Sequence, residues 1–412
     1  MATDCVAANR PYNPRQPDLA CADKIRGSWQ GDFMKRRDFL AGAATGLVAG
    51  AVGGYSASRA GKRSAVVDAG TAPAILSGRQ EWRMATTWPD KFPGIGTGAE
   101  RLAKRISEMS EGRLNITVYS QGKLVAPFGT FDAVSQGTIE MGHGAAYYWQ
   151  SRSRACSFFA AVPFGFTATE LSAWMGYGGG QQLYDELYAS FDLKPFLAGN
   201  TGAQMGGWFT HEIHSIADFK SLKFRMPGLG GEVLRRIGAT PINLPGSDIL
   251  QALQSGTIDA TEWVGPWNDL AFGFHQVAKH YYWPGFHEPG TGVELIVNKP
   301  KFDALPRDLQ IIVSDACQAE TNAMLAEFDA RNGEALKTLI NEHGVQLHQF
   351  PEDVLAAFGK ASQQVLSEYD TGDDITQRVY GSFKSFRDSV LPWTRIADQG
   401  YMNMRSKALG LG

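Results

Sequence analysis

The chain contains one motif twice, as AVSQGTIE at residues 133–140 and as ALQSGTID at residues 252–259. Each copy indicates the end of an amphipathic helix, then a glycine able to take the left-handed conformation, then a strand that starts Thr-Ile-acid. A short apolar strand precedes each copy, at 114–118 and at 240–244. Two copies of one strand–helix–strand unit predict two similar lobes, and chance similarity over so short a stretch is the alternative.

The segment that precedes the first copy is typical of an α/β protein. Residues 81–88 alternate as a strand does, and Pro89 ends the run. A helix is expected next, with Leu102, Ile106 and Met109 on one face. Two α/β lobes of this kind enclose a cleft, and such a cleft is a favoured place for a ligand.

The C-terminal third differs from the lobes. Long helices are expected at 305–333, 353–369 and 375–391. We therefore expect all-helical packing around the lobes in this region.

Composition narrows the class of partner. The 412 residues carry a formal net charge of −3. We expect neither a nucleic acid nor an anionic membrane surface as a partner, because both favour a basic protein. The 10 Trp and 13 Tyr suit a protein with a pocket, although a well-filled core explains most of them.

The chain has four cysteines, Cys5, Cys21, Cys156 and Cys317. The first two precede the export signal described next, so only Cys156 and Cys317 belong to the mature domain. Their wide separation in sequence leaves two alternatives open, a single disulfide or two buried free thiols.

The N-terminal segment indicates export. The stretch MKRRDFL at 34–40 opens a run that is uncharged from Phe39 to Tyr55. Paired arginines before a Gly/Ala-rich run resemble a twin-arginine signal, which sends folded proteins to the periplasm; an uncleaved anchor is the alternative. We assign residues 34–78 to the signal and a linker, and residues 1–33 to an extension of doubtful relevance.

Catalytic motifs are mostly missing from the sequence. The glycine-rich stretches 94–98 and 228–231 lack the spacing of a dinucleotide-binding loop, and no HExxH, GxSxG or Walker-type lysine is found. His211 and His214 lie in a polar segment, where a solvated pair is the ordinary interpretation. The sequence therefore does not favour an enzyme.

Polar side chains within apolar runs are more informative. Amides and glycines mix in 199–208, Glu262 stands between apolar neighbours, and Glu288 lies in a Pro/Gly-rich stretch. Arg225 lies within an apolar strand, where a guanidinium suits two-pronged binding of a carboxylate. Buried carboxylates need a cation or hydrogen bonds. Exposed loop acids and a structural ion pair are the alternatives.

These segments together resemble the substrate-binding proteins of tripartite ATP-independent periplasmic (TRAP) transporters, in particular the branch that binds 2-oxo acids. The resemblance extends from Glu81 to Trp393. The motifs that carry it are residues 199–208, 222–225, 255–263 and 281–285. It implies an α/β, two-lobed periplasmic binding protein fold with a hinge and a long helical C-terminal region.

The resemblance also implies a division of the mature chain. Lobe I is expected to comprise residues 79–198 plus about 290–335, and lobe II residues 199–289. The helical region from about 336 to 412 packs on the lobes and is a candidate dimer contact.

The same resemblance gives each site residue a role. Arg225 holds the substrate carboxylate in a two-pronged salt bridge. A cation beside the substrate is bound by Gln204, Glu262, the main-chain carbonyl of Trp263, and Glu288. All of these ligands are oxygen atoms, which favour a hard cation, Na⁺ or Ca²⁺. The other residues implied to form the pocket are Tyr147, Tyr148 and Asn200, with Trp208 supporting its wall.

The sequence departs from the family pattern around Glu288. His287 and Pro289 flank it where an aromatic residue and a glycine are expected, and Glu294 lies near enough in sequence to compete as a ligand. The acid recognised therefore stays open among pyruvate, lactate and longer 2-oxo acids, as does the choice between Na⁺ and Ca²⁺. The implied protein partners are the TRAP membrane subunits and a second copy of the chain.

Two other functions stay open for a chain with these features. One is a periplasmic metal-dependent enzyme acting on 2-oxo acids, with Glu262 or Glu288 as its base. Missing nucleophile–base pairs weigh against it. The other is a sensory ligand-binding module, because such modules reuse this fold.

Overall fold

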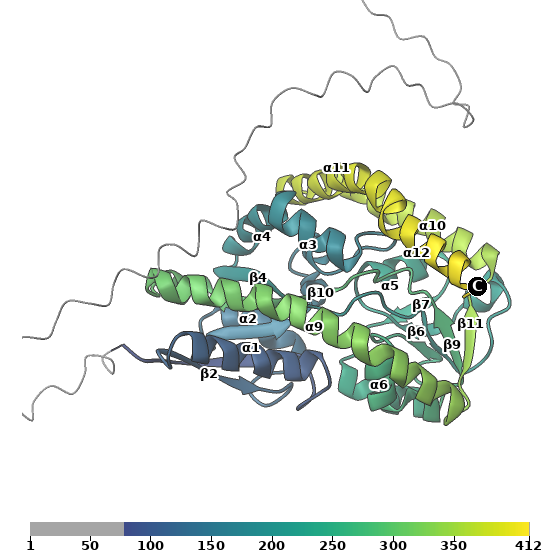
Figure 1. The fold of residues 1–412 in the computed structure, drawn as a ribbon, viewed down its shortest axis with the longest axis horizontal. Coiled ribbons are helices and arrows are strands. Elements are labelled where there is room, and N and C mark those ends of the chain that lie inside the picture. Colours follow the sequence, from purple (N-terminus) through teal and green to yellow (C-terminus); the bar gives the residue numbers. More distant parts are fainter. Residues whose placement is uncertain (1–77, 412) are drawn as a thin grey trace, which may run out of the picture. The chain divides into compact units, whose positions relative to one another are not determined.

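The structure is a computed structural model that describes residues 78–411. The export signal predicted at 34–40 lies outside these residues, as do Cys5 and Cys21. The described part is a mixed α/β structure with two sheets (Figure 1), which confirms the predicted fold class. Within it, no helix combines the length and the apolar character that a membrane span requires.

The first sheet, here called the lobe I sheet, has five strands in the order β2-β1-β3-β10-β4. β1 pairs in parallel with β2 and β3, whereas β10 is antiparallel to β3 and β4. The strands are β1 (Gln80–Thr86), β2 (Leu114–Tyr119), β3 (Met141–Gly144), β4 (Leu193–Asn200) and β10 (Gly292–Asn298).

The second sheet, here called the lobe II sheet, has six strands in the order β11-β9-β5-β8-β6-β7. β6 is parallel to β7 and β8, and β5 is antiparallel to β8 and β9. Both sheets therefore share one topology, in which β7, β6, β8, β5 and β9 take the places of β2, β1, β3, β10 and β4. The strands are β5 (Gly207–Phe209), β6 (Lys223–Arg225), β7 (Thr240–Ile242), β8 (Ala260–Thr261), β9 (His280–Trp283) and β11 (Gln346–Gln349).

The repeated motif occupies equivalent places in the two lobes. Gly137 and Gly256, which follow the two helices, are both left-handed, with φ of 70° and 69°. The strands β3 and β8 begin only after the acid of each motif, so the predicted strand start at Thr-Ile is wrong. The reason is that the amides of Ile139 and Ile258 donate to carbonyls of the preceding helix, at 3.3 and 3.2 Å, instead of to a neighbouring strand.

Two short connecting segments join the two sheets, and the long helix α9 (Arg307–Asn341) makes a third connection, from β10 to β11. Residues 201–206 lead from β4 to β5, and residues 284–291 lead from β9 back to β10. Each sheet therefore receives one antiparallel strand, β10 or β5, through a crossing of the chain. Both connecting segments carry predicted site residues.

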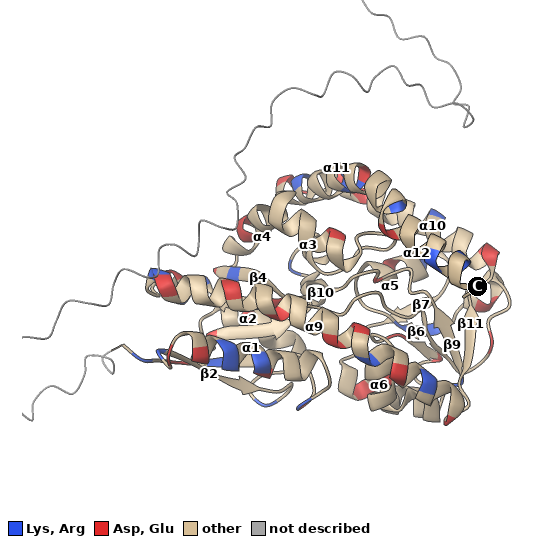
Figure 2. Cartoon of the chain, viewed as in Figure 1, with Lys and Arg blue, Asp and Glu red and all other residues tan. Residues whose placement is uncertain are grey.

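Helices cover both sheets. The 35-residue helix α9 packs on β4 and α1 of lobe I and on α7 of lobe II (Figure 1). Arg101 of α1 donates to Glu320 of α9 at 2.6 Å, and both helices carry basic and acidic residues (Figure 2). The helices are α1 (Ile95–Met109), α2 (Thr130–Ser135), α3 (Ala168–Tyr177), α4 (Gly180–Ala189), α5 (Gly228–Arg236), α6 (Gly246–Gln254), α7 (Pro266–Phe272), α8 (Lys299–Asp303), α9 (Arg307–Asn341), α10 (Glu352–Ser367), α11 (Asp374–Ile396) and α12 (Asp398–Leu409).

The structure differs from the sequence expectations at two further points. β11 interrupts the C-terminal region that was expected to be all-helical, and it extends the lobe II sheet beside β9. Met109, expected on the apolar face of α1, is 43% exposed because the helix ends there. Cys156 and Cys317 are both buried free thiols, which supports that alternative over a disulfide.

Candidate functional site

Two lobe II strands and the two connecting segments bring the predicted site residues together. Arg225 is the last residue of β6, and Glu262 directly follows the neighbouring strand β8. Gln204 lies in the first connecting segment and Glu288 in the second, and the amide of Gln204 donates to the carbonyl of Glu288 at 3.1 Å. All four residues are at most 3% exposed.

Arg225 and Glu262 form a buried ion pair. Arg225 Nη1 donates to Glu262 Oε1 and to the Glu262 carbonyl, the latter at 3.3 Å. Arg225 Nε donates to the carbonyl of Leu244 at 3.1 Å. The remaining nitrogen, Nη2, is buried without a hydrogen-bond partner among the described residues. A buried donor without a partner is costly. Nη2 is therefore the nitrogen that can donate to an anionic ligand.

Glu288 and Gln204 belong to one hydrogen-bond network. Glu288 Oε2 accepts from Thr291 Oγ1 at 2.5 Å and from the Tyr147 hydroxyl at 3.5 Å. Gln204 Nε2 donates to the hydroxyls of Thr201 and Thr291, both at 3.0 Å. Gln204 Oε1 is buried with no partner in the described part of the chain. This oxygen is therefore able to bind a cation.

The electrostatics of the cluster favour an added positive charge. Burial, followed by the charge of Glu262, raises the pKa of the Glu288 carboxyl to about 7. Burial also raises the pKa of Tyr148 to about 12, so its hydroxyl keeps its proton and can donate a hydrogen bond. The one guanidinium pairs with Glu262 and leaves Glu288 without an ion-pair partner, so a cation beside the two carboxyl groups would bring the buried cluster closer to neutrality.

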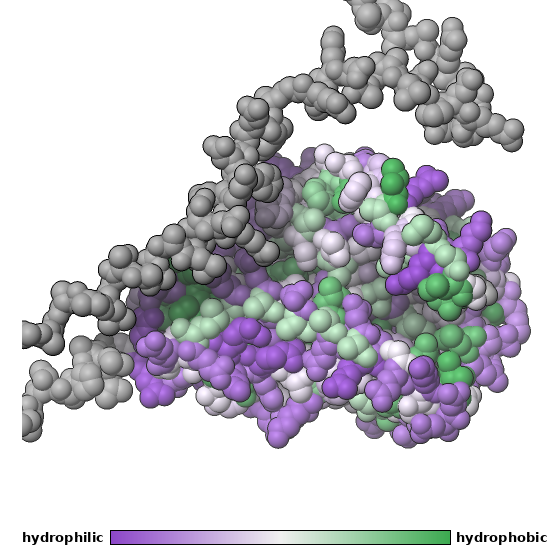
Figure 3. All heavy atoms as spheres, in the orientation of Figure 1, coloured by the Kyte–Doolittle hydropathy of each residue, from purple (hydrophilic) through white to green (hydrophobic). Residues whose placement is uncertain are grey.

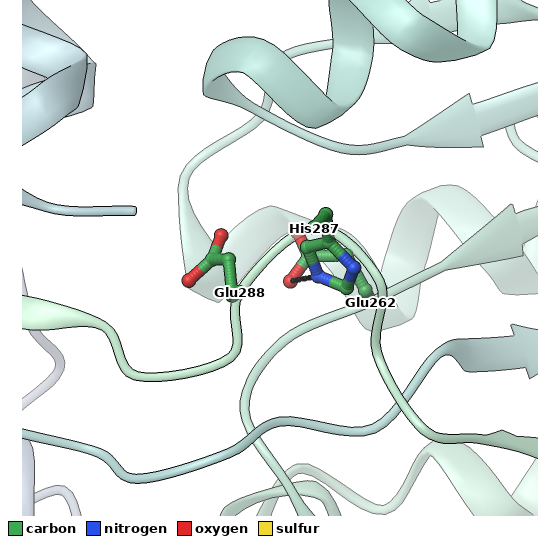
Figure 4. A group of neighbouring side chains, drawn as sticks. All are labelled: Glu262, His287 and Glu288. Atoms are coloured by element: carbon green, nitrogen blue, oxygen red, sulfur yellow. Dashed lines mark hydrogen bonds and ion pairs between the residues drawn. The ribbon is translucent and has the colours of Figure 1, made fainter. Parts of the chain in front are cut away.

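His287 completes a group of three potential metal ligands. One ligand atom from each of Glu262, His287 and Glu288 lies within 4.8 Å of the others (Figure 4). His287 Nε2 is 3.4 Å from Glu262 Oε2. Together with the unpartnered Gln204 oxygen, the two carboxylates offer hard ligands of the kind that Na⁺ and Ca²⁺ prefer. The residues present therefore fit the cation that the resemblance implies.

Aromatic rings enclose a small cavity beside these groups. Its volume is about 10 Å³, which is room for about one water molecule. The Arg225 guanidinium lies over the Trp263 ring, 5.2 Å from its centroid. An organic acid therefore fits only after the lining side chains have moved apart. Its lining consists of Trp88, Ile95, Ala145, Tyr147, Tyr148, Thr201, Gln204, Trp263, Val264, Thr291 and Val293.

Arg225, Glu262 and Glu288 lie beside this lining rather than in it, and Asn200 and Trp208, also predicted for the site, are not part of it either. Asn200 Oδ1 accepts from the amide of Gly202 at 2.8 Å, which shapes the first connecting segment. Trp208 Nε1 donates to Asp269 at 2.9 Å, and its ring stacks on Tyr281 with a centroid separation of 4.0 Å. Both side chains therefore support the elements that carry the site.

Glu294 belongs neither to the cavity lining nor to the group of potential metal ligands. Its carboxylate instead accepts hydrogen bonds from Trp149, Tyr184 and Tyr188 of lobe I. It is therefore not placed to compete with Glu288 as a ligand.

Several lining residues were not predicted from the sequence. Trp88 follows β1, and ligands of parallel sheets bind beyond the carboxyl ends of the strands, so its position was an available signal. Thr201 and Thr291 carry no such signal, because a threonine in a connecting segment is ordinary. For Val293 the sequence indicates only a core residue of a strand.

The chain matches a known protein family and several characterised relatives. Residues 84–371 match the family described as bacterial extracellular solute-binding protein, family 7. A monocarboxylate 2-oxoacid-binding periplasmic protein of Nostoc sp. is 42% identical over 327 residues, which are 79% of this chain and 89% of that protein.

Solved structures of TRAP solute-binding proteins are also similar to this chain. A TRAP periplasmic solute-binding protein from Pseudoalteromonas atlantica, with bound sodium and pyruvate, is 42% identical with a TM-score of 0.77, covering 79% of this chain and 99% of that one. A TRAP transporter solute-binding protein from Bordetella bronchiseptica, a dimer with calcium and picolinate in its occupied site, is 37% identical with a TM-score of 0.79, covering 81% and 98%.

Proposed function

Because the chain belongs to the family of bacterial extracellular solute-binding proteins, family 7, we propose that it captures a small 2-oxo acid, pyruvate or a close analogue, and delivers it to TRAP membrane subunits. Two complementary buried atoms carry the proposal. Arg225 Nη2 is a donor without a partner, and Gln204 Oε1 is an acceptor without one, within the described residues. A carboxylate satisfies the first, and a cation satisfies the second.

The molecules bound to two relatives share a chemical feature. Pyruvate accompanies sodium in one and picolinate accompanies calcium in the other. Each acid carries a second donor atom next to its carboxylate, so that one cation can contact both donors. The cavity of this chain must widen to admit such an acid.

We assign the site residues to roles on this basis. Arg225 holds the carboxylate, and Gln204, Glu262, Glu288 and the main-chain carbonyl of Trp263 hold Na⁺ or Ca²⁺. When bound, the cation supplies the positive charge that offsets the two buried carboxylates. The residues that form hydrogen bonds to the ligand or support the site are Tyr147, Tyr148, Asn200 and Trp208.

We infer that the chain acts outside the cytoplasm, from the matched family and from the N-terminal sequence. The matched family is extracellular, and we assign export to the twin-arginine stretch at 34–40. The matched proteins bind solutes rather than transform them, so we expect no turnover of the acid. The lobe boundaries given above, with the connecting segments as the hinge, form part of the same proposal.

The C-terminal helices support a homodimer. Trp393 of α11 is 67% exposed, Ile396 is 73% exposed, and α12 has no buried residue. Figure 3 shows hydrophobic surface in the region of these helices. A second copy that covers this surface would remove the apolar area from water. Light scattering should give twice the chain mass for the wild type and a monomer for Trp393→Glu.

A thermal-shift panel tests the ligand assignment. Oxo, hydroxy and plain carboxylic acids of increasing length are added to the protein with Na⁺, with Ca²⁺ or with chelator. A ligand at a hundredfold excess over its Kd should raise the Tm by about 4 °C for a domain of this size. If no 2-oxo or 2-hydroxy acid shifts the Tm under any of these conditions, the assignment fails.

A further inference from the structure

Glu294 is a buried carboxylate next to the cavity but outside the proposed cation site. It follows Val293, which lines the cavity, in β10. The pairing of β10 with β4 is irregular between these two residues, and neither Glu294 nor any side chain that donates to it lines the cavity. Glu294 therefore lies behind the cavity wall. It is 2% exposed.

Neutral donors alone hold this carboxylate. The indole of Trp149 donates to Oε1, and the hydroxyls of Tyr184 and Tyr188 donate to Oε2, the latter at 3.0 Å. Burial raises the pKa of Glu294 to about 7, and no basic side chain of the described residues is among the groups that act on it. A buried acid without a counterion is costly, which suggests that this position has a use beyond filling the core.

The donors come from two different elements. Tyr184 and Tyr188 belong to α4, whereas Trp149 ends a 3₁₀ turn, Ala146–Trp149, that also carries Tyr147 and Tyr148 of the cavity wall. Gly144 of β3 pairs with Glu294 and leaves room for the Trp149 indole. A Cβ atom at Gly144 would lie only 3.2 Å from Trp149 Cζ2.

We propose that Glu294 is a positioning residue for the ligand cavity, which it shapes by fixing the Trp149 indole and with it the turn that presents Tyr147 and Tyr148. This inference rests on the proposed function, because it concerns the wall of the same cavity. A carboxylate suits the task because it has two acceptor oxygens, one for the indole and one for the tyrosines. An amide has a single acceptor oxygen, so it can hold both sides only if the tyrosine hydroxyls turn to accept from its NH₂ group.

Glu294→Gln tests this link, with Tyr188→Phe as its matched control. Both variants disturb the same buried hydrogen-bond cluster, but only Glu294→Gln changes the group that accepts from Trp149. Pyruvate affinity is measured by calorimetry, and the amide and indole N–H resonances of residues 146–149 by NMR. In Glu294→Gln we expect these resonances to shift and the affinity to fall about 2- to 30-fold, the usual coupling through a positioned neighbour. Tyr188→Phe should lower the Tm yet leave the affinity within about twofold.

The inference is overturned if Glu294→Gln binds pyruvate as the wild type does, or if Tyr188→Phe weakens binding equally, since the cluster then acts only on stability. If Glu294→Gln does not fold, Trp149→Phe breaks the same link from the other side and must reproduce the loss of affinity. Failure of the proposed function has a different result, because the wild type then shows no pyruvate binding. The resonances of 146–149 still decide the link in that case: a shift in Glu294→Gln supports it, and unchanged resonances refute it.

Discussion

Arg225→Ala is expected to abolish most of the affinity for the acid. The guanidinium is 1% exposed, and its Nη2 is the one nitrogen for which the described residues supply no partner. Truncating one member of a buried, hydrogen-bonded charge pair costs about 2–5 kcal/mol, which corresponds to a loss of affinity of about 30- to 4,000-fold. Arg225→Lys keeps the charge but not the planar fork, so it should fall between the wild type and Arg225→Ala.

The same substitution also affects stability, and a second variant separates the two effects. Removing the guanidinium leaves Glu262 buried without its ion-pair partner, which costs about 3–5 kcal/mol of unfolding free energy. Arg225→Ala combined with Glu262→Gln removes that unpaired charge, so stability should recover while affinity does not. Arg235→Ala is the control, because Arg235 is 58% exposed at the end of α5, and a surface change of this kind stays within about 0.5 kcal/mol.

Calorimetry with pyruvate and urea unfolding provide the two measurements for these variants. The reasoning is refuted if Arg225→Ala binds pyruvate within about threefold of the wild type, since such a loss is below about 0.7 kcal/mol. It is also refuted if Arg235→Ala loses as much affinity as Arg225→Ala.

Three further outcomes follow from the structure. Burial alone would raise the pKa of Glu140, but hydrogen bonds from Arg83 and Lys301 lower it to about 2. The stabilising contribution of this carboxylate is therefore present above pH 4.5 and is lost as the pH falls towards 2. Over that range the Tm of Glu140→Gln should fall less than the Tm of the wild type. Cys156 and Cys317 should resist iodoacetamide until the chain unfolds, because burial raises the pKa of both thiols; labelling of the native protein in peptide maps would contradict this. Phe358→Ala should lower the unfolding free energy in urea by about 3–5 kcal/mol, since this ring is fully buried; a loss below about 1 kcal/mol would show that its packing contributes little.

The shared topology of the lobes could be predicted because its cause is local. Gly137 and Gly256 allow the left-handed turn that ends each helix, and the sequence shows both glycines directly. The start of each following strand could not be predicted in the same way. It depends on whether Ile139 and Ile258 donate to the helix or to a neighbouring strand, and a hydrophobic pattern does not distinguish the two.

β11 was missed for a different reason. Its sequence, QLHQ at 346–349, has mostly exposed side chains and no apolar face. Its pairing with β9 depends on where α9 ends in the fold, which is a tertiary effect. An edge strand of this kind carries little signal of its own.

The site shows a similar division between local and tertiary information. Charged residues within apolar runs identified Arg225 and Glu262, with ion pairing and ligand binding as alternative interpretations of the arginine. The structure shows that the two are compatible, because Nη1 pairs with Glu262 while Nη2 stays unpartnered among the described residues. Thr201 and Thr291 could not be predicted, because only the fold brings their hydroxyls to Gln204.

The most direct test of the central claim is calorimetric titration of pyruvate and of propionate into protein freed of cations, and again after addition of Ca²⁺ or Na⁺. Pyruvate should bind tightly only when the cation is present. Propionate, which lacks the second oxygen, should bind at least about 100-fold more weakly, because the buried polar groups of the site are then left without a partner. Equal affinity for the two acids, or pyruvate binding that is indifferent to the cation, would contradict the account.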